Sequence, residues 1–82
     1  MLQPKLLRVL PMQNHKLNLF YETGEEKIFD VTPYLSGHWF SELRDFTYFS
    51  RVCLLPDGIG IEWPDGQDIA PHELYELSTT VS

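Results

Sequence analysis

Three carboxylates near the end of the chain are the first candidates for a chemical site. Glu62, Asp65 and Asp68 lie close together in the sequence. Paired carboxylates can act as general acid and base, and a group of three can bind a hard cation. However, Asp65 belongs to a Pro-Asp-Gly turn, Asp68 can tie the loop or cap the following helix, and Glu62 can remain solvated. We therefore expect no catalytic residue and no metal ligand among them.

The histidines and the single cysteine form no recognisable site either. His15, His38 and His72 have no metal-ligand spacing, and Cys53 has no second cysteine near it. A zinc site would require His38, His72 and Cys53 to meet through the fold alone, and a nucleophilic pair of Cys53 with a distant histidine is no better supported. The Gly-Ile-Gly at 58–60 precedes a strand, whereas a phosphate loop precedes a helix. We expect no cofactor and no enzymatic activity.

Two Pro-Asp-Gly turns, at 56–58 and 64–66, organise the region that positions these residues. In each turn proline presets φ, aspartate can bond its own backbone, and glycine takes the left-handed conformation. The five residues between them predict a strand with Ile59, Ile61 and Trp63 on one face. We expect a β-meander with strands at 51–55, 59–63 and 67–69, closed by a helix at 71–77.

The first half of the chain predicts three further strands, at 6–12, 16–21 and 26–30. In the second of these, Leu17, Leu19 and Tyr21 share one face, and Gly24 supplies the hairpin turn that follows. Ser36 can cap a helix at 37–44, and Asp45 can cap a single turn at 46–50.

The fold class that follows is α+β, with a mainly antiparallel sheet, the order βββ-α-βββ-α, and two short helices on one face. The 82 residues predict one domain, 1–82, with a core at about 5–77 and a loose tail at 78–82.

The charge distribution bears on the partners. The net charge is −6, yet residues 1–21 carry three basic residues and no acid. Residues 52–82 carry no lysine or arginine and six acids, Asp57, Glu62, Asp65, Asp68, Glu73 and Glu76. Such a segment is a poor candidate for direct nucleic-acid binding. It either keeps a small protein soluble or faces a basic protein partner. With no apolar signal core and no membrane-length segment, we expect a cytoplasmic protein without a membrane partner.

The sheet is expected to carry apolar residues on both faces, whereas a face in contact with solvent is normally polar. Since strand side chains alternate, Phe20 cannot share a face with Leu17 and Leu19, and Ile28 and Phe29 cannot point the same way. The second face of the sheet should therefore carry Phe20, one of Ile28 and Phe29, and Cys53 or its neighbours. Such a surface is covered by a loop or by an interface, either with a second copy of the chain or with another protein.

The sequence resembles a bacterial family called domain of unknown function 2442. The resemblance covers about residues 5–76, and its most specific part is Trp63-Pro64-x-Gly66-x-Asp68 continuing to Pro71 and Leu74-Tyr75. It implies a small α+β protein of no established activity, often encoded beside another small protein in the manner of a toxin–antitoxin pair. Some relatives append a helix-turn-helix DNA-binding domain. The chain stops at Ser82, so we do not expect a role carried by such an appendage.

These observations favour a small non-catalytic protein-interaction module, antitoxin-like or regulatory. The expected partner-binding residues are Phe20, Glu62, Asp65, Asp68, Glu73 and Glu76, and the partner is a small basic protein or a second copy. The alternative is a small-molecule-sensing module of the kind found fused to helix-turn-helix domains. It requires a closed apolar pocket near Trp39, Trp63 and Tyr75.

Overall fold

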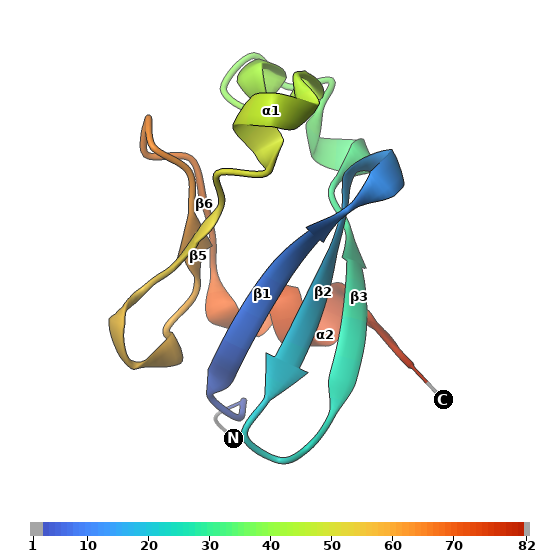
Figure 1. Cartoon of the computed structure of the whole chain (residues 1–82), viewed down its shortest axis with the longest axis vertical. Coiled ribbons are helices and arrows are strands. Elements are labelled where there is room, and N and C mark those ends of the chain that lie inside the picture. The colour runs from blue at the N-terminus through green and yellow to red at the C-terminus, as the bar shows by residue number, and fades with distance from the viewer. Residues whose placement is uncertain (1–2, 82) are drawn as a thin grey trace.

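The chain begins with a three-stranded antiparallel meander. The structure, a computed structural model, describes residues 3–81 (Figure 1). Strands β1 (Leu6–Met12), β2 (Lys16–Tyr21) and β3 (Glu26–Asp30) have the predicted bounds. Asn14 and Gly24 take positive φ in the two connecting turns, at 64° and 91°. Both residue types tolerate the left-handed region, which lets the chain reverse tightly. The predicted α+β class and antiparallel pairing are confirmed.

The central strand β2 separates a core face from an open face. Leu17 and Leu19 are completely buried, opposite Phe29 and Lys27 of β3. The other face, here called the open face, alternates with this set. It consists of Arg8, Leu10 and Met12 of β1, Lys16, Asn18 and Phe20 of β2, and Glu26, Ile28 and Asp30 of β3. The predicted apolar second face is therefore present, with Ile28 and not Phe29 on it.

A second, smaller sheet is built from β4 (Cys53–Leu54), β5 (Ile61–Glu62) and β6 (Asp68–Ile69). Cys53 belongs to this sheet and not to the open face, which corrects the prediction for that residue. The strands are shorter than predicted because Asp57, Gly58 and Gly60 all take positive φ, at 61°, 65° and 139°. The chain becomes extended only from Ile61.

Because residues 57–60 are not extended, Ile59 lies outside the strand and points elsewhere than predicted. Ile59 is 58% exposed, so it does not share the buried face of Ile61 and Trp63 as predicted. The glycine conformations at both Pro-Asp-Gly turns are as expected, since Gly66 also takes a positive φ of 98°.

The helix predicted at 37–44 is not formed. A short 3₁₀ helix (Ser41–Arg44) follows a series of turns, and α1 (Phe46–Phe49) begins after Asp45, whose side chain accepts the Thr47 N–H as predicted. The reason lies in the backbone carbonyls. Leu43 N–H bonds Phe40 O in the 3₁₀ manner, at 3.0 Å, and Trp39 O accepts the Gln67 side chain at 3.2 Å. An α-helix would need Leu43 to bond Trp39.

The two helices occupy different places. Helix α2 (Pro71–Leu77), which has the predicted bounds, crosses behind β1–β3, while α1 lies at one end of the molecule (Figure 1). No helix among residues 3–81 has the length and hydropathy needed to cross a membrane.

The residues after α2 are paired and not loose, contrary to the predicted tail at 78–82. Strand β7 (Thr79–Thr80) adds to the outer edge of β3, with Thr79 opposite Ile28 and Thr80 opposite Lys27. Val81 N–H donates to Glu26 O at 2.8 Å. Unpaired groups on a sheet edge readily accept a strand, which explains why a short polar segment is ordered here. Ser82 lies outside the described residues.

The core lies between the back of β1–β3, the smaller sheet and α2. Trp63 is its largest residue and is 1% exposed. Its indole N–H donates to Phe49 O at 2.8 Å, and the two rings lie 5.9 Å apart. The other fully or nearly fully buried apolar residues are Leu6, Leu17, Leu19, Tyr21, Phe29, Val31, Leu43, Phe49, Ile61, Ile69 and Leu74. Trp63 thus ties α1 to the second sheet.

We predict that Gly58→Ala destabilises the fold through contact between the two sheets. A Cβ at this position would stand 2.5 Å from Leu6 O and 2.9 Å from Leu6 N, and the φ is positive. Both effects oppose a side chain, so the free energy of unfolding should fall by at least about 2 kcal/mol. Gly24→Ala is the control, because it shares the positive φ but meets no atom within 4 Å. Gly24→Ala should lower the free energy of unfolding by about 1 kcal/mol. Urea denaturation measures both variants, and equal losses for the two would contradict this explanation.

Trp63→Ala should lower the free energy of unfolding by about 3–5 kcal/mol, because it empties the largest core position. Trp63→Phe keeps a ring against Phe49 but leaves Phe49 O without its donor, and a loss of about 1–3 kcal/mol is expected. Chemical denaturation followed by circular dichroism measures both. A loss below about 1 kcal/mol for the alanine variant would show that the ring is not a core residue.

Candidate functional site

Two of the predicted acidic residues lie side by side on the outside of the smaller sheet. Glu62 of β5 pairs with Asp68 of β6, and Cys53 of β4 continues the same row. The adjacent row, Ile61 and Ile69, is buried against the core. Because side chains alternate along a strand, the row with Glu62 and Asp68 must point outward. Asp68 and Cys53 are exposed.

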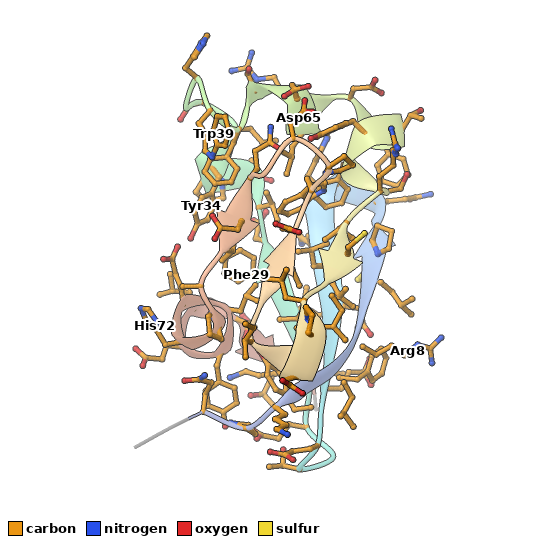
Figure 2. All side chains as sticks on the ribbon, turned by 90° about the vertical axis from the view of Figure 1, so that its left-hand side faces the viewer. Arg8, Phe29, Tyr34, Trp39, Asp65 and His72 are labelled. Carbon is orange, nitrogen blue, oxygen red and sulfur yellow. The ribbon has the colours of Figure 1, made fainter. Side chains whose placement is uncertain are left out.

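A third predicted acid, Asp65, stands at the turn between β5 and β6 next to a carboxylate that the sequence did not suggest. Asp65 N–H donates to the Tyr48 hydroxyl at 2.8 Å. The carboxyl of Asp65 is a hydrogen-bond partner of Glu42, and this contact raises the pKa of Glu42. The hydrogen bond favours the protonated form of Glu42, and the nearby Asp65 charge adds to this effect. Figure 2 shows Asp65 at the end of the molecule that also carries Trp39.

Gln67 fixes this acidic turn, a role that the sequence analysis missed. Its side chain is completely buried. The amide nitrogen donates to Glu42 Oε1 at 2.9 Å and to Trp39 O at 3.2 Å, and its oxygen accepts the Tyr48 hydroxyl at 2.7 Å. A buried amide with every hydrogen bond satisfied specifies one geometry. No local sequence signal distinguishes this glutamine from a solvated turn residue.

The acids of α2 are in two different situations. Glu76 is exposed, whereas the half-buried Glu73 carboxylate accepts a hydrogen bond from the Tyr34 hydroxyl. Burial, and then this carboxylate, raise the pKa of Tyr34 to about 12. Glu73 therefore connects α2 to residues 32–34 and is not free in the way that Glu62, Asp68 and Glu76 are.

Phe20, the remaining predicted residue, lies apart from the acids. It stands on the open face of β2, with the Arg8 guanidinium 5.7 Å from its ring centre. In Figure 2 the smaller sheet faces the viewer, while Arg8 projects to the right. The predicted site residues therefore occupy two surfaces, one acidic and one, the open face, with both apolar and charged residues.

No group of three or more histidine, cysteine or carboxylate side chains within residues 3–81 is arranged to bind a metal ion. His15 is packed edge-on against Phe49, with ring centres 5.1 Å apart. The exposed Cys53 thiol has the Arg51 carbonyl 3.5 Å away. Cys53 shares a sheet with the acids, and nothing brings His38 or His72 to it in the described contacts.

A buried polar cluster at the other end of the meander is a second feature that the sequence did not reveal. Lys27 points to the core face, is 7% exposed, and donates to Tyr75 O at 2.6 Å near the end of α2. Its ammonium also lies 4.0 Å from the centre of the Tyr75 ring. A cation is favourable at a helix C-terminus, and the hydroxyl of Tyr75 in turn donates to Glu25 at 2.8 Å. Lys27 thus anchors α2 to the sheet.

Along residues 3–81, two hollows lie at one edge of the meander, and neither is lined by Trp39, Trp63 or Tyr75, where the sensing hypothesis needs a pocket. The first, of about 320 Å³, is lined by Phe29, Asp30, Pro33, Tyr34 and Leu77. The second, of about 560 Å³, is lined by Lys16, Ile28, Asp30, Leu77, Thr79, Thr80 and Val81. Both flank the exposed Leu77 at the end of α2, along the edge of β3.

Comparison with protein families matches residues 7–80 to the model described as "Protein of unknown function (DUF2442)". The match covers nearly the whole chain, including both surfaces. The chain belongs to the DUF2442 family. Comparison with the curated proteins and comparison with the solved structures each gave no match. Membership of DUF2442 confirms the predicted resemblance and assigns no activity, so function in this DUF2442 protein has to be argued from its surfaces.

Among the side chains of residues 3–81 in this DUF2442 protein, the Tyr21 hydroxyl is buried without a hydrogen-bond partner. Burial, then Tyr75 and Glu25, raise the pKa of Tyr21 to about 12. In the unfolded chain the pKa of tyrosine is near its ordinary value of 10.0. The folded protein therefore holds this proton more tightly, and its stability should fall as the pH rises from about 10 through about 12. Tyr34, with the same direction of shift, contributes to the same loss.

We predict that Tyr21→Phe reduces this alkaline loss of stability and leaves stability at pH 7 unchanged or higher by about 1 kcal/mol, because it removes an unpaired buried hydroxyl. Urea unfolding at pH 7 and at pH 11 measures both quantities. Tyr75→Phe is the matched control and should be destabilising at pH 7, since its hydroxyl donates to Glu25. A clear loss of stability in Tyr21→Phe at pH 7 would mean that the hydroxyl has a partner.

Proposed function

We propose that this protein is a non-catalytic protein-interaction module that binds a basic protein through its acidic surface. The acidic surface is defined here as Glu42, Glu62, Asp65 and Asp68, around the outer face and the connecting turn of β5 and β6. The observation that carries the proposal is the outward row of Glu62 and Asp68 in a segment, 52–82, without lysine or arginine.

The geometry favours association and not chemistry at this surface. Glu42, Asp65 and Asp68 are exposed and Glu62 is half-buried, and they stand on a backbone held by Gln67 and Tyr48. Concentrated charge of one sign speeds the encounter with an oppositely charged protein and discriminates against wrong partners. A cation that approaches Glu42 and Asp65 is attracted by both carboxylates. A lysine- or arginine-rich surface is therefore the partner that this site favours.

An antitoxin-like or regulatory role is the biological form of this proposal. The resemblance to a family whose members are often encoded beside another small protein supports it. The alternative, small-molecule sensing, is less supported, because both hollows lie at the edge of β3 and open beside Leu77. An enclosed apolar cavity would suit a small ligand better.

The test is binding of a fluorescent ten-residue oligolysine peptide, followed by anisotropy at two salt concentrations. The wild-type chain should bind in a salt-sensitive manner, because exposed charges are screened at high salt. Glu62→Gln combined with Asp68→Asn should weaken binding about tenfold at low salt and reduce the salt dependence.

The control is Glu22→Lys, which raises the net charge by the same two units at the exposed turn between β2 and β3. It should bind the peptide nearly as well as the wild type. If both variants lose affinity equally, the peptide responds to total charge and not to the acidic surface. That outcome, or equal binding by all three proteins, contradicts the proposal.

A further inference from the structure

The open face of the meander carries both apolar and charged side chains. In Figure 1 α2 crosses behind β1–β3, and neither helix nor the smaller sheet covers the front. Leu10 and Met12 are 38% and 37% exposed, and Phe20 and Ile28 are half-buried. Exposed apolar positions in adjacent strands are typical of an interface.

The register arranges the open face in three rows across the strands. The first row is Arg8–Phe20–Glu26, the second is Leu10–Asn18–Ile28 with Thr79 beyond it, and the third is Met12–Lys16–Asp30. Two bases and two acids are present, so the face is neutral, although the whole chain has a net charge of −6. A neutral surface does not select a basic or an acidic partner.

The first row has opposite charges on either side of an aromatic ring. Arg8 stands on β1 and Glu26 on β3, with Phe20 between them. The Asn18 amide donates to Glu26 Oε2 at 2.9 Å, which holds this carboxylate in place. Arg8 is likewise placed over the Phe20 ring. Both charges are therefore positioned on the face before any partner arrives.

From this arrangement we propose that the open face binds a second copy of the chain, related by a twofold axis parallel to β2. Each β1 then lies over β3 of the second copy, so that Arg8 faces Glu26 in both directions. Leu10 faces Ile28, and the two Phe20 rings meet at the axis. An axis perpendicular to the strands is disfavoured, because it would place Glu26 over Asp30. A twofold interface must be self-complementary in this way.

The shape of the face agrees with this pairing. The larger hollow lies beside β3, and its lining includes Ile28, Asp30, Thr79 and Val81. In the proposed dimer the exposed Leu10 and Met12 of β1 lie over the hollow of the second copy. The exposed apolar side chains of β1 thus meet a depression lined by both apolar and polar residues, on both halves at once. The third row adds no charge pair, because the same axis places Met12 opposite Asp30 and the two Lys16 side chains opposite each other.

The size of the face sets the expected affinity. Three strands about 4.8 Å apart and about 20 Å long give a footprint of roughly 300 Å² per copy, below the ~800 Å² of a standard interface. We therefore expect a weak dimer, with a dissociation constant on the order of tens of micromolar. This association uses a different surface from the acidic one, so it stands or falls independently of the proposed function.

Sedimentation velocity of the wild-type chain from about 5 µM to about 1 mM tests the dimer directly, across the expected micromolar range. Arg8→Glu and Glu26→Arg should each raise the dissociation constant about tenfold or more, because each places like charges opposite one another. Glu62→Arg changes the charge by the same amount as Glu26→Arg on the acidic surface, and should leave the dimer unchanged. Circular dichroism spectra confirm that each variant is folded.

Mixing the two weakened variants gives the decisive result. In a heterodimer of Arg8→Glu with Glu26→Arg, the introduced acid meets the introduced base at one contact, and the original pair is kept at the other. An equimolar mixture should therefore associate with close to wild-type affinity. A wild type that stays monomeric at about 1 mM overturns the proposal. So do charge reversals without effect, or a mixture no tighter than its components.

Discussion

The alternation of side chains along β2 is the constraint on which the rest of the structure depends. Hydrogen-bonded neighbours on both sides fix the strand, so every second residue must enter the core and every other one must face outward. Leu17, Leu19 and Tyr21 form the floor on which α2 and the smaller sheet pack. The same pairing obliges Phe20 to face outward between Arg8 and Glu26. The core and the proposed dimer surface are thus two consequences of one register.

The regular part of the fold could be predicted from the sequence because its signals are local. The alternating pattern and the turn residues Asn14 and Gly24 define β1–β3, and Pro71 starts α2 at a position where a missing N–H costs nothing. The region 37–44 could not be predicted in this way. Within it the Trp39 carbonyl accepts a hydrogen bond from the distant Gln67 side chain, and just before it the Leu35 carbonyl accepts one from Arg44. Such contacts leave no periodic pattern in the sequence.

The candidate site likewise contains some residues that the local sequence pattern predicts and others that only the fold brings together. The outward direction of Glu62 follows from the burial of Ile61 and Trp63, which the alternation predicted. Glu42, by contrast, joins Asp65 only through the fold, and Glu73 bonds Tyr34 across a separation that no local motif reveals. Lys27 is the clearest case of a missed residue. Its position on the core face follows from the register, but a buried lysine becomes acceptable only once Tyr75 O and the Tyr75 ring are beside it.

The short strand β7 has a consequence for how this protein avoids uncontrolled polymerisation. Thr79 and Thr80 pair with part of the outer edge of β3. The opposite edge of the sheet, formed by β1, is interrupted by an irregular register between Leu6 and Arg8 and by Pro11, which lacks an N–H. Neither edge therefore presents a long, regular row of free backbone groups with which a further strand could pair. Growth into fibrils by edge addition is therefore hindered, and the broad surfaces of the sheets remain the places where another molecule can attach.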